Sequence, residues 1–199
     1  MSFEVVEYFE EEIAEYFGAP YAVATDSCTH AIELCLRAEN LGVAAIPAHT
    51  YISVPFTLKK LGIDFWWSEE KWSEYYCISN TRVIDAAVYW RENGYIPGKL
   101  MCLSFQYKKH LSLGRGGAIL LDDKEMYHKL KRMSYDGRES GAPWAEQDIK
   151  EVGYHYYMTP ETAQQGIAKL TMAKVTQPKK WSWQDYPDLR NMSVFKQNS

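Results

Sequence analysis

Short apolar runs alternate along this chain with stretches whose apolar positions recur at helical spacing. Apolar residues between Phe3 and Phe17 share one face opposite glutamates, which predicts an amphipathic helix that ends at Gly18. The same reasoning predicts further helices over residues 28–41, 53–61, 123–133 and 160–173, and strands over residues 21–25, 43–47, 63–67, 83–87, 100–105 and 118–121.

Alternation of strands and helices predicts an α/β fold of three layers, with a mainly parallel sheet covered by helices on both faces. In such sheets the chemistry gathers at the carboxyl ends of the strands. Polar side chains that end or follow predicted strands should therefore meet at one edge. They are Ser27, Tyr51, Asp85 and Ser104.

A length of 199 residues is enough for one domain with a substantial core, and somewhat short for two. We expect residues 1–176 to form that domain. Residues 177–199 hold Trp181, Trp183 and Tyr186 without any helical or strand period, and they predict an arm that packs on another part of the chain.

Net charge and composition exclude some classes of partner. A net charge of −4 and the lack of a basic block argue against a nucleic-acid partner. No apolar run approaches the ~20 residues of a membrane-spanning helix, and the acidic first residues lack the profile of a signal peptide. The four cysteines show no paired spacing and predict free thiols in a reducing, cytoplasmic setting. The histidines form no metal-binding motif, so we expect no metal.

Three features carry candidate chemistry, and each has an ordinary reading when taken alone. Lys109, between the strands over 100–105 and 118–121, would by itself be read as part of a surface basic patch with its neighbours. Asp85, at the end of a strand, could instead bind a loop backbone. The hydroxyls of Ser27 and Thr29 open a helix, where simple capping is common.

Taken together, these residues suit one cofactor. A lysine can hold the aldehyde of pyridoxal 5'-phosphate (PLP) and a carboxylate can pair with its ring nitrogen. A helix N-terminus with hydroxyls can bind its phosphate. An aromatic residue such as Tyr51 could stack on the ring, although in a chain with fifteen tyrosines a place in the core is the better interpretation of Tyr51 taken alone.

Read in order, the chain resembles the large domain of the PLP-dependent nucleotide-sugar aminotransferases, the DegT/StrS group of fold type I. The matching stretches include IPAHTYISVPFTLKKLG, VIDAA, CLSFQYKKHLSLGRGGAILLDD and GYHYYMTPETAQQGIAKL. The lysine that follows SF and precedes a glycine-rich turn is the specific part of the likeness. The resemblance spans most of residues 3–170.

That resemblance implies a role for each candidate residue. Lys109 corresponds to the lysine that binds the cofactor aldehyde, Asp85 to the partner of the ring nitrogen, and Tyr51 to the stacking aromatic. Phosphate would be held by Ser104 and the helix start, Ser27, Cys28 and Thr29. Members are homodimers with shared active sites, and His155 takes the place of an asparagine that reaches the partner's phosphate.

The resemblance implies a PLP-dependent aminotransferase that moves nitrogen from an amino acid, by family habit glutamate, to a keto-sugar nucleotide. The chain departs from the family at Val88, where a glutamine is usual, and at Cys28, where a glycine is usual. It is also shorter between Trp67 and Val83, and only residues 177–199 stand where the family has a small C-terminal domain.

Those departures support an alternative, a catalytically impaired protein of the same fold that serves as a binding or regulatory partner. A third interpretation, a dehydrogenase-like nucleotide-binding domain, lacks a GxGxxG motif after its first strand.

Overall fold

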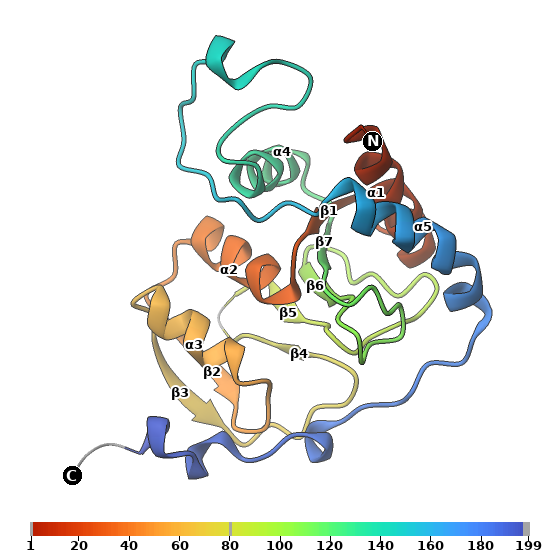
Figure 1. Ribbon diagram of the computed structural model, residues 1–199. Coiled ribbons are helices and arrows are strands. Elements are labelled where there is room, and N and C mark those ends of the chain that lie inside the picture. The colour runs from red at the N-terminus through yellow and green to blue at the C-terminus, as the bar shows by residue number, and fades with distance from the viewer. Residues whose placement is uncertain (1, 80, 197–199) are drawn as a thin grey trace.

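The computed structural model describes residues 2–79 and 81–196. Its larger sheet has the strand order β1-β7-β6-β5-β4 and a smaller one pairs β2 with β3 (Figure 1). The strands are β1 (Tyr21–Thr25), β2 (Val43–Pro47), β3 (Asp64–Ser68), β4 (Tyr76–Cys77), β5 (Val83–Asp85), β6 (Leu100–Ser104) and β7 (Gly117–Leu121).

The sequence predicts a mainly parallel sheet, whereas three of the four strand pairs of the larger sheet, as far as the structure describes it, are antiparallel. β5 and β6 run parallel, and β7 lies antiparallel to both β6 and β1, so β1, β5 and β6 point the same way. β7 is reversed because a loop, rather than a crossover helix, returns the chain from β6. The parallel pair β2 and β3 joins the larger sheet through a bridge from Ala45 to Ser79.

Helices cover both faces of the sheet, which confirms the predicted three-layer α/β class. They are α1 (Glu4–Phe17), α2 (Cys28–Glu39), α3 (Ser53–Lys60), α4 (Lys124–Ser134) and α5 (Pro160–Val175). In Figure 1, α1 and α5 lie on one side of the sheet and α2, α3 and α4 on the other. Of the helices within residues 2–79 and 81–196, none has both the length and the apolar character needed to span a bilayer.

Alternate residues of the strands pack into two separate hydrophobic cores, one on each face of the sheet. On β6, Met101 and Leu103 pack with α1 and α5, whereas Leu100 and Cys102 pack with α2, α3 and α4. Successive residues of such a strand face opposite cores. Because both faces are buried, these strands are almost continuously apolar in sequence.

Local signals fix the helix ends. Gly18 adopts a left-handed conformation (φ 71°) and its N–H closes α1, as its position predicted. Ser27 caps α2 by accepting from the amide of His30 at 3.2 Å. The short strand β4 was not predicted, because residues 68–81 show no clear period.

The segment from Gln177 to Lys196, called here the C-terminal arm, lies along one edge of the molecule (Figure 1). It contains short 3₁₀ turns at Trp183–Asp185, Leu189–Asn191 and Ser193–Phe195. The amide of Leu189 donates to the carbonyl of Ala48 at 3.0 Å, so the arm is anchored on the loop that follows β2. Residues 197–199 of the predicted arm lie outside the described residues.

A buried ion pair links α1 to α4. The carboxylate of Glu10 is 5% exposed, accepts from the ammonium of Lys131 at 2.8 Å and accepts from the amide of Ala24 at 2.7 Å. It therefore joins α1, β1 and α4 at one point.

We expect Lys131→Met to destabilise the fold by about 3 kcal/mol, because the variant leaves a buried carboxylate without its cation. Chemical denaturation in urea measures the change. Lys174→Met is the matched control: it breaks the more exposed pair with Glu12 (2.9 Å) and should cost at most about 1 kcal/mol. Equal losses in both variants would contradict the assigned role of Glu10.

Candidate active site

A cavity of about 390 Å³ opens where β1, β5 and β6 end. Its volume is in the range of small-molecule binding pockets. Because these strands point the same way, the residues that follow them meet at one edge, as the sequence predicted. The cavity wall includes Ser27, Cys28, Thr29, Tyr51, Asp85, Ser104 and Lys109.

Asp85 is the buried acid of this cavity, with 7% of its surface exposed. One carboxylate oxygen accepts from the hydroxyl of Tyr76 at 2.7 Å and the other from the amide of Ala87 at 3.0 Å. Burial raises the pKa of Asp85, while these two donors and the charge of Lys109 act to lower it. A carboxylate has about four acceptor positions, so it retains capacity for another donor.

Tyr76 belongs to β4 and stands opposite Asp85 in the sheet. Burial, together with the charge of Asp85, raises the pKa of Tyr76 well above its usual value. The phenol therefore stays protonated and donates to the carboxylate. The hydroxyl of Thr50 is hydrogen-bonded to the same phenol and so holds the Tyr76 ring in position.

Lys109 lies on the loop between β6 and β7, half-buried in the cavity wall. Burial lowers the pKa of its ammonium, Lys108 lowers it further, and Asp85 and Cys28 oppose the change. Its Nζ donates to the hydroxyl of Tyr186 at 3.4 Å. Such a lysine loses its proton more readily than a solvated one.

The start of α2 lines one side of the cavity with groups that could bind an anion. The first amides of a helix have no partner within the helix, and here they belong to Cys28 and Thr29. The Thr29 hydroxyl lies 2.8 Å from the Ser53 hydroxyl, at the start of α3. Gly117 packs so closely that a Cβ there would lie 2.5 Å from the Cys28 nitrogen.

The remaining candidates differ in how they face the cavity. Tyr51 is 57% exposed, so it lies at the mouth and not in the core. Ser104 ends β6 and lines the wall. The thiol of Cys28 donates to the carbonyl of Cys102 at 3.4 Å, so its sulfur points into the sheet layer, and burial raises its pKa well above normal.

His155 lies outside the cavity of its own chain. It is exposed, with Nδ1 3.0 Å from a carboxylate oxygen of Asp136 and Nε2 3.1 Å from the hydroxyl of Tyr157. The structure therefore brings together the other candidate residues and leaves His155 on the surface.

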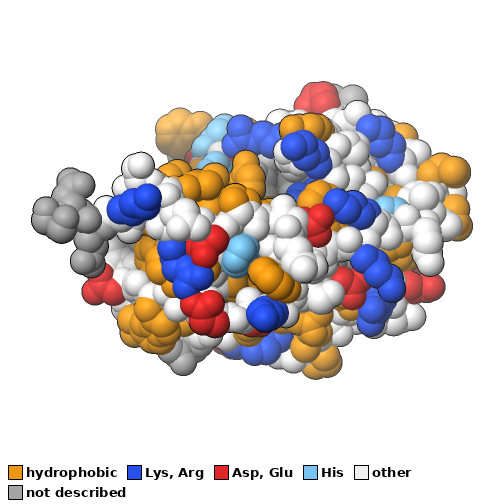
Figure 2. All heavy atoms as spheres, turned by 90° about the horizontal axis from the view of Figure 1, so that it is seen from below, with side chains coloured by type: hydrophobic (Ala, Val, Ile, Leu, Met, Phe, Trp, Pro, Cys, Tyr) orange, Lys and Arg blue, Asp and Glu red, His pale blue; other side chains and the backbone are white. Residues whose placement is uncertain are grey.

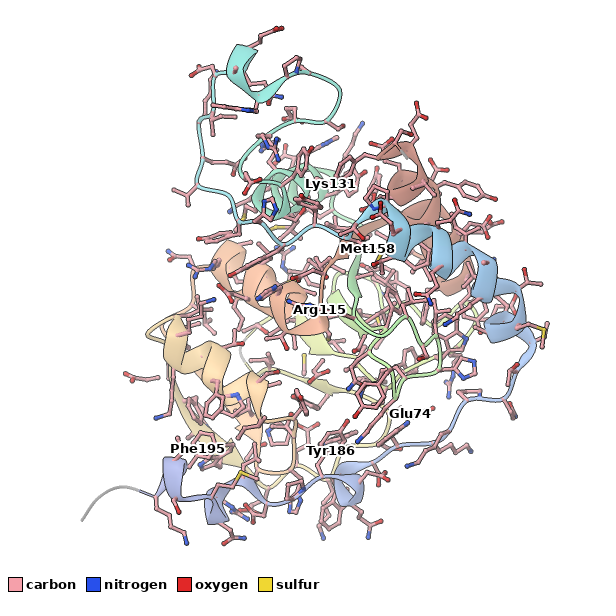
Figure 3. All side chains as sticks on the ribbon, in the orientation of Figure 1. Glu74, Arg115, Lys131, Met158, Tyr186 and Phe195 are labelled. Carbon is pink, nitrogen blue, oxygen red and sulfur yellow. The ribbon has the colours of Figure 1, made fainter. Side chains whose placement is uncertain are left out.

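Several residues of the site were not predicted from the sequence. Tyr76 lies in the stretch without a period, and Tyr186 and Trp181 belong to the arm, whose packing partner was not predicted. Figure 3 shows Tyr186 on the arm and Arg115 near the start of α2, where the guanidinium of Arg115 pairs with Asp26 at 2.7 Å. The unusual density of Trp and Tyr in residues 181–186 was the available signal for the arm.

Comparison with known proteins agrees with this geometry. The sequence profile of the DegT/DnrJ/EryC1/StrS aminotransferase family matches residues 1–97 and 84–189. The chain belongs to this family. No curated protein matches the chain significantly.

Solved structures similar to this family member share its fold at low identity. AtS13 from Actinomadura melliaura superposes with a TM-score of 0.74 at 20% identity, covering 87% of this chain and 61% of AtS13. DesI, solved in the presence of its TDP-sugar product, gives 0.70 at 20%, covering 87% and 54%. Helicobacter pylori PseC, an aminotransferase of pseudoaminic acid biosynthesis, gives 0.70 at 16%, covering 85% and 58%. The chain thus spans about three fifths of their length.

The family's cofactor fits the residues of this cavity. The buried carboxylate of Asp85 has acceptor capacity left, Lys109 has a lowered pKa, and the helix start offers amides and hydroxyls. The missing Cβ at Gly117 leaves the Cys28 amide undisturbed. Acid, amine and anion site thus line one cavity, as a pyridine ring with an aldehyde and a phosphate requires.

We expect Gly117→Ala to weaken the uptake of pyridoxal phosphate at least tenfold, because the new methyl group displaces the amides at the start of α2. Fluorescence titration with the cofactor measures the change. Gly42→Ala adds the same methyl group where nothing lies within 4 Å, and it should leave uptake unchanged. Equal uptake by both variants would rule out the close approach as a requirement.

We expect Asp85→Asn to lower the pKa of Lys109 further, because the acid's negative charge stabilises the ammonium. Competitive acetylation followed by mass spectrometry over a pH series reads the pH at which the amine becomes reactive. Lys109 should become reactive at lower pH in the variant than in the wild type. A shift to higher pH would show that the two groups do not interact in this way.

Proposed function

We propose that this chain is a PLP-dependent aminotransferase that transfers nitrogen from an amino acid, glutamate by family habit, to a keto-sugar nucleotide. The observation that carries the proposal is the shared cavity of a buried acid, Asp85, and a desolvated amine, Lys109. Family membership supports the reaction type. The names of DesI, with its TDP-sugar product, and PseC support the substrate class.

When bound, PLP would supply an aldehyde for the amino group and a protonated ring that withdraws electrons from the donor's α-carbon. Asp85 would accept a hydrogen bond from the ring nitrogen and keep it protonated. Tyr51 would cover the ring at the cavity mouth. The start of α2 and Ser104 would hold the phosphate.

Lys109 would anchor the aldehyde and then act as the proton carrier. Because burial lowers its pKa, Lys109 gives up its proton more readily than a solvated lysine, and the resulting amine would remove the proton from the α-carbon of the donor. The donor's nitrogen would stay in the site, and the donor would leave as a 2-oxo acid whose new oxygen comes from water. In the second half of the reaction the retained nitrogen would replace the keto oxygen of the sugar, which departs as water. Lys109 would then deliver a proton to the former keto carbon, so that the sugar leaves as an amine.

The alternative, a regulatory partner without catalysis, is less well supported. Burying a carboxylate costs stability unless it is well paired, and a scaffold needs neither Asp85 nor a desolvated Lys109.

We further propose a homodimer in which the exposed His155 reaches the phosphate of the partner's site, in keeping with the resemblance. A cytoplasmic location agrees with the four free thiols.

We expect the purified protein with added PLP to absorb in the near-visible, and Lys109→Ala to lose this band because the covalent link to the aldehyde cannot form. Lys180→Ala, an exposed lysine of the arm, is the control and should keep the band. Addition of glutamate should bleach the wild type. Sedimentation of the same samples tests the dimer, and a protein that takes up no PLP would rule out the proposed activity.

A further inference from the structure

A second cavity, of about 200 Å³, adjoins the first. The two share part of their walls, including Val88, Ser104, Lys109 and Trp181. Lys109 therefore stands between the two spaces. The second cavity is bounded by the loop after β5, the loop after β6 and the C-terminal arm, so it is formed only where the arm is docked.

The titratable side chains around this second cavity, apart from one tyrosine, are all basic. Its wall includes Lys108, Lys109, His110 and Lys179, and no Asp or Glu from the described part of the chain lines it. The whole chain has a net charge of −4, so this is a local reversal of sign. Figure 2, which views the molecule from the side of the arm, shows basic side chains among acidic and hydrophobic ones, not one continuous apolar patch.

Two of these basic side chains, Lys108 and Lys179, are available for a ligand. His110 is engaged, because its Nε2 lies 2.8 Å from the carbonyl of Ala173 and must donate to it. Lys108 has no carboxylate partner among residues 2–79 and 81–196. Lys179 is held by Asp185 at 3.1 Å but keeps further donor positions.

Trp181 positions these charges. Its ring centroid lies 3.7 Å from the ammonium of Lys179 and 5.3 Å from that of Lys109. Both distances are within the range of cation–π attraction. The indole therefore holds the arm's lysine beside the amine that would carry out the reaction.

We propose that the second cavity binds the carboxylate of the amino-acid donor, with Lys108 and Lys179 as its charge partners. This inference rests on the proposed function. In an amino acid the carboxylate and the reacting nitrogen are bonded to the same carbon, so a carboxylate site has to adjoin Lys109. The diphosphate of a sugar nucleotide is separated from its keto carbon by part of the sugar ring, so it fits this position less well.

By this proposal the C-terminal arm, which lines the first cavity, also takes part in binding the donor. It carries Lys179 and Trp181 into the site, and the donor's carboxylate would meet one cation from the loop after β6 and one from the arm. Lys180, the next residue of the arm, lines neither cavity, so the chain itself offers a matched control.

Calorimetric titration of glutarate, a dicarboxylate without an amino group, into the PLP-treated protein tests the assignment without any reaction. We expect the double variant Lys108→Gln, Lys179→Gln to bind glutarate at least tenfold more weakly than the wild type, because two charge-assisted contacts are lost. Lys180→Gln should bind as the wild type does. The near-visible band should stay the same in all samples.

The outcomes separate the two proposals. Unchanged glutarate binding in the double variant, with the band present, would overturn the carboxylate site and leave the proposed function intact. A loss of affinity for uridine diphosphate, and not for glutarate, would assign the cations to a phosphate and also overturn it. A wild type without the band would overturn the proposed function, and with it the identity of the ligand as an amino donor.

Discussion

The hydrogen bond from Tyr76 to Asp85 is the contact on which the site depends. A carboxylate buried at the edge of the sheet is costly, and the phenol of β4 and the amide of Ala87 offset that cost. The same contact ties β4 to β5. Lys109, on the next loop, then lies in the field of an acid whose position is fixed, and each group shifts the pKa of the other.

Much of this arrangement could be predicted from the sequence, because strand ends are local features. The boundaries of β1 and β2 follow directly from their apolar runs, and Ser27, Asp85 and Ser104 were placed at one edge by strand direction alone. The predicted alternation did not show that β7 runs antiparallel to its neighbours, since periodicity fixes which face a residue occupies but not the direction of a strand.

The side chains that residues 68–81 and the C-terminal arm place in the site could not be predicted from the sequence. Tyr76 sits on a strand of two residues, too short for a period to register. Tyr186 reaches Lys109 from seventy-seven positions away, by a packing of aromatic rings that no local pattern encodes. The arm packs on residues 68–81. The amide of Glu74 donates to the backbone carbonyl of Trp181 at 2.9 Å, and the amide of Trp183 donates to the backbone carbonyl of Trp72 at 3.1 Å.

The docked arm also affects how quickly molecules enter and leave the cavity. Tyr186 and Trp181 form part of the wall around Lys109. The arm is held by backbone hydrogen bonds, aromatic contacts, side-chain hydrogen bonds to its Tyr186 and an exposed ion pair between Arg190 and Glu69. Local opening of such a segment needs far less free energy than unfolding of the sheet. The residence time of a ligand in the cavity would then depend on how often the C-terminal arm opens, as lid opening limits turnover in many enzymes.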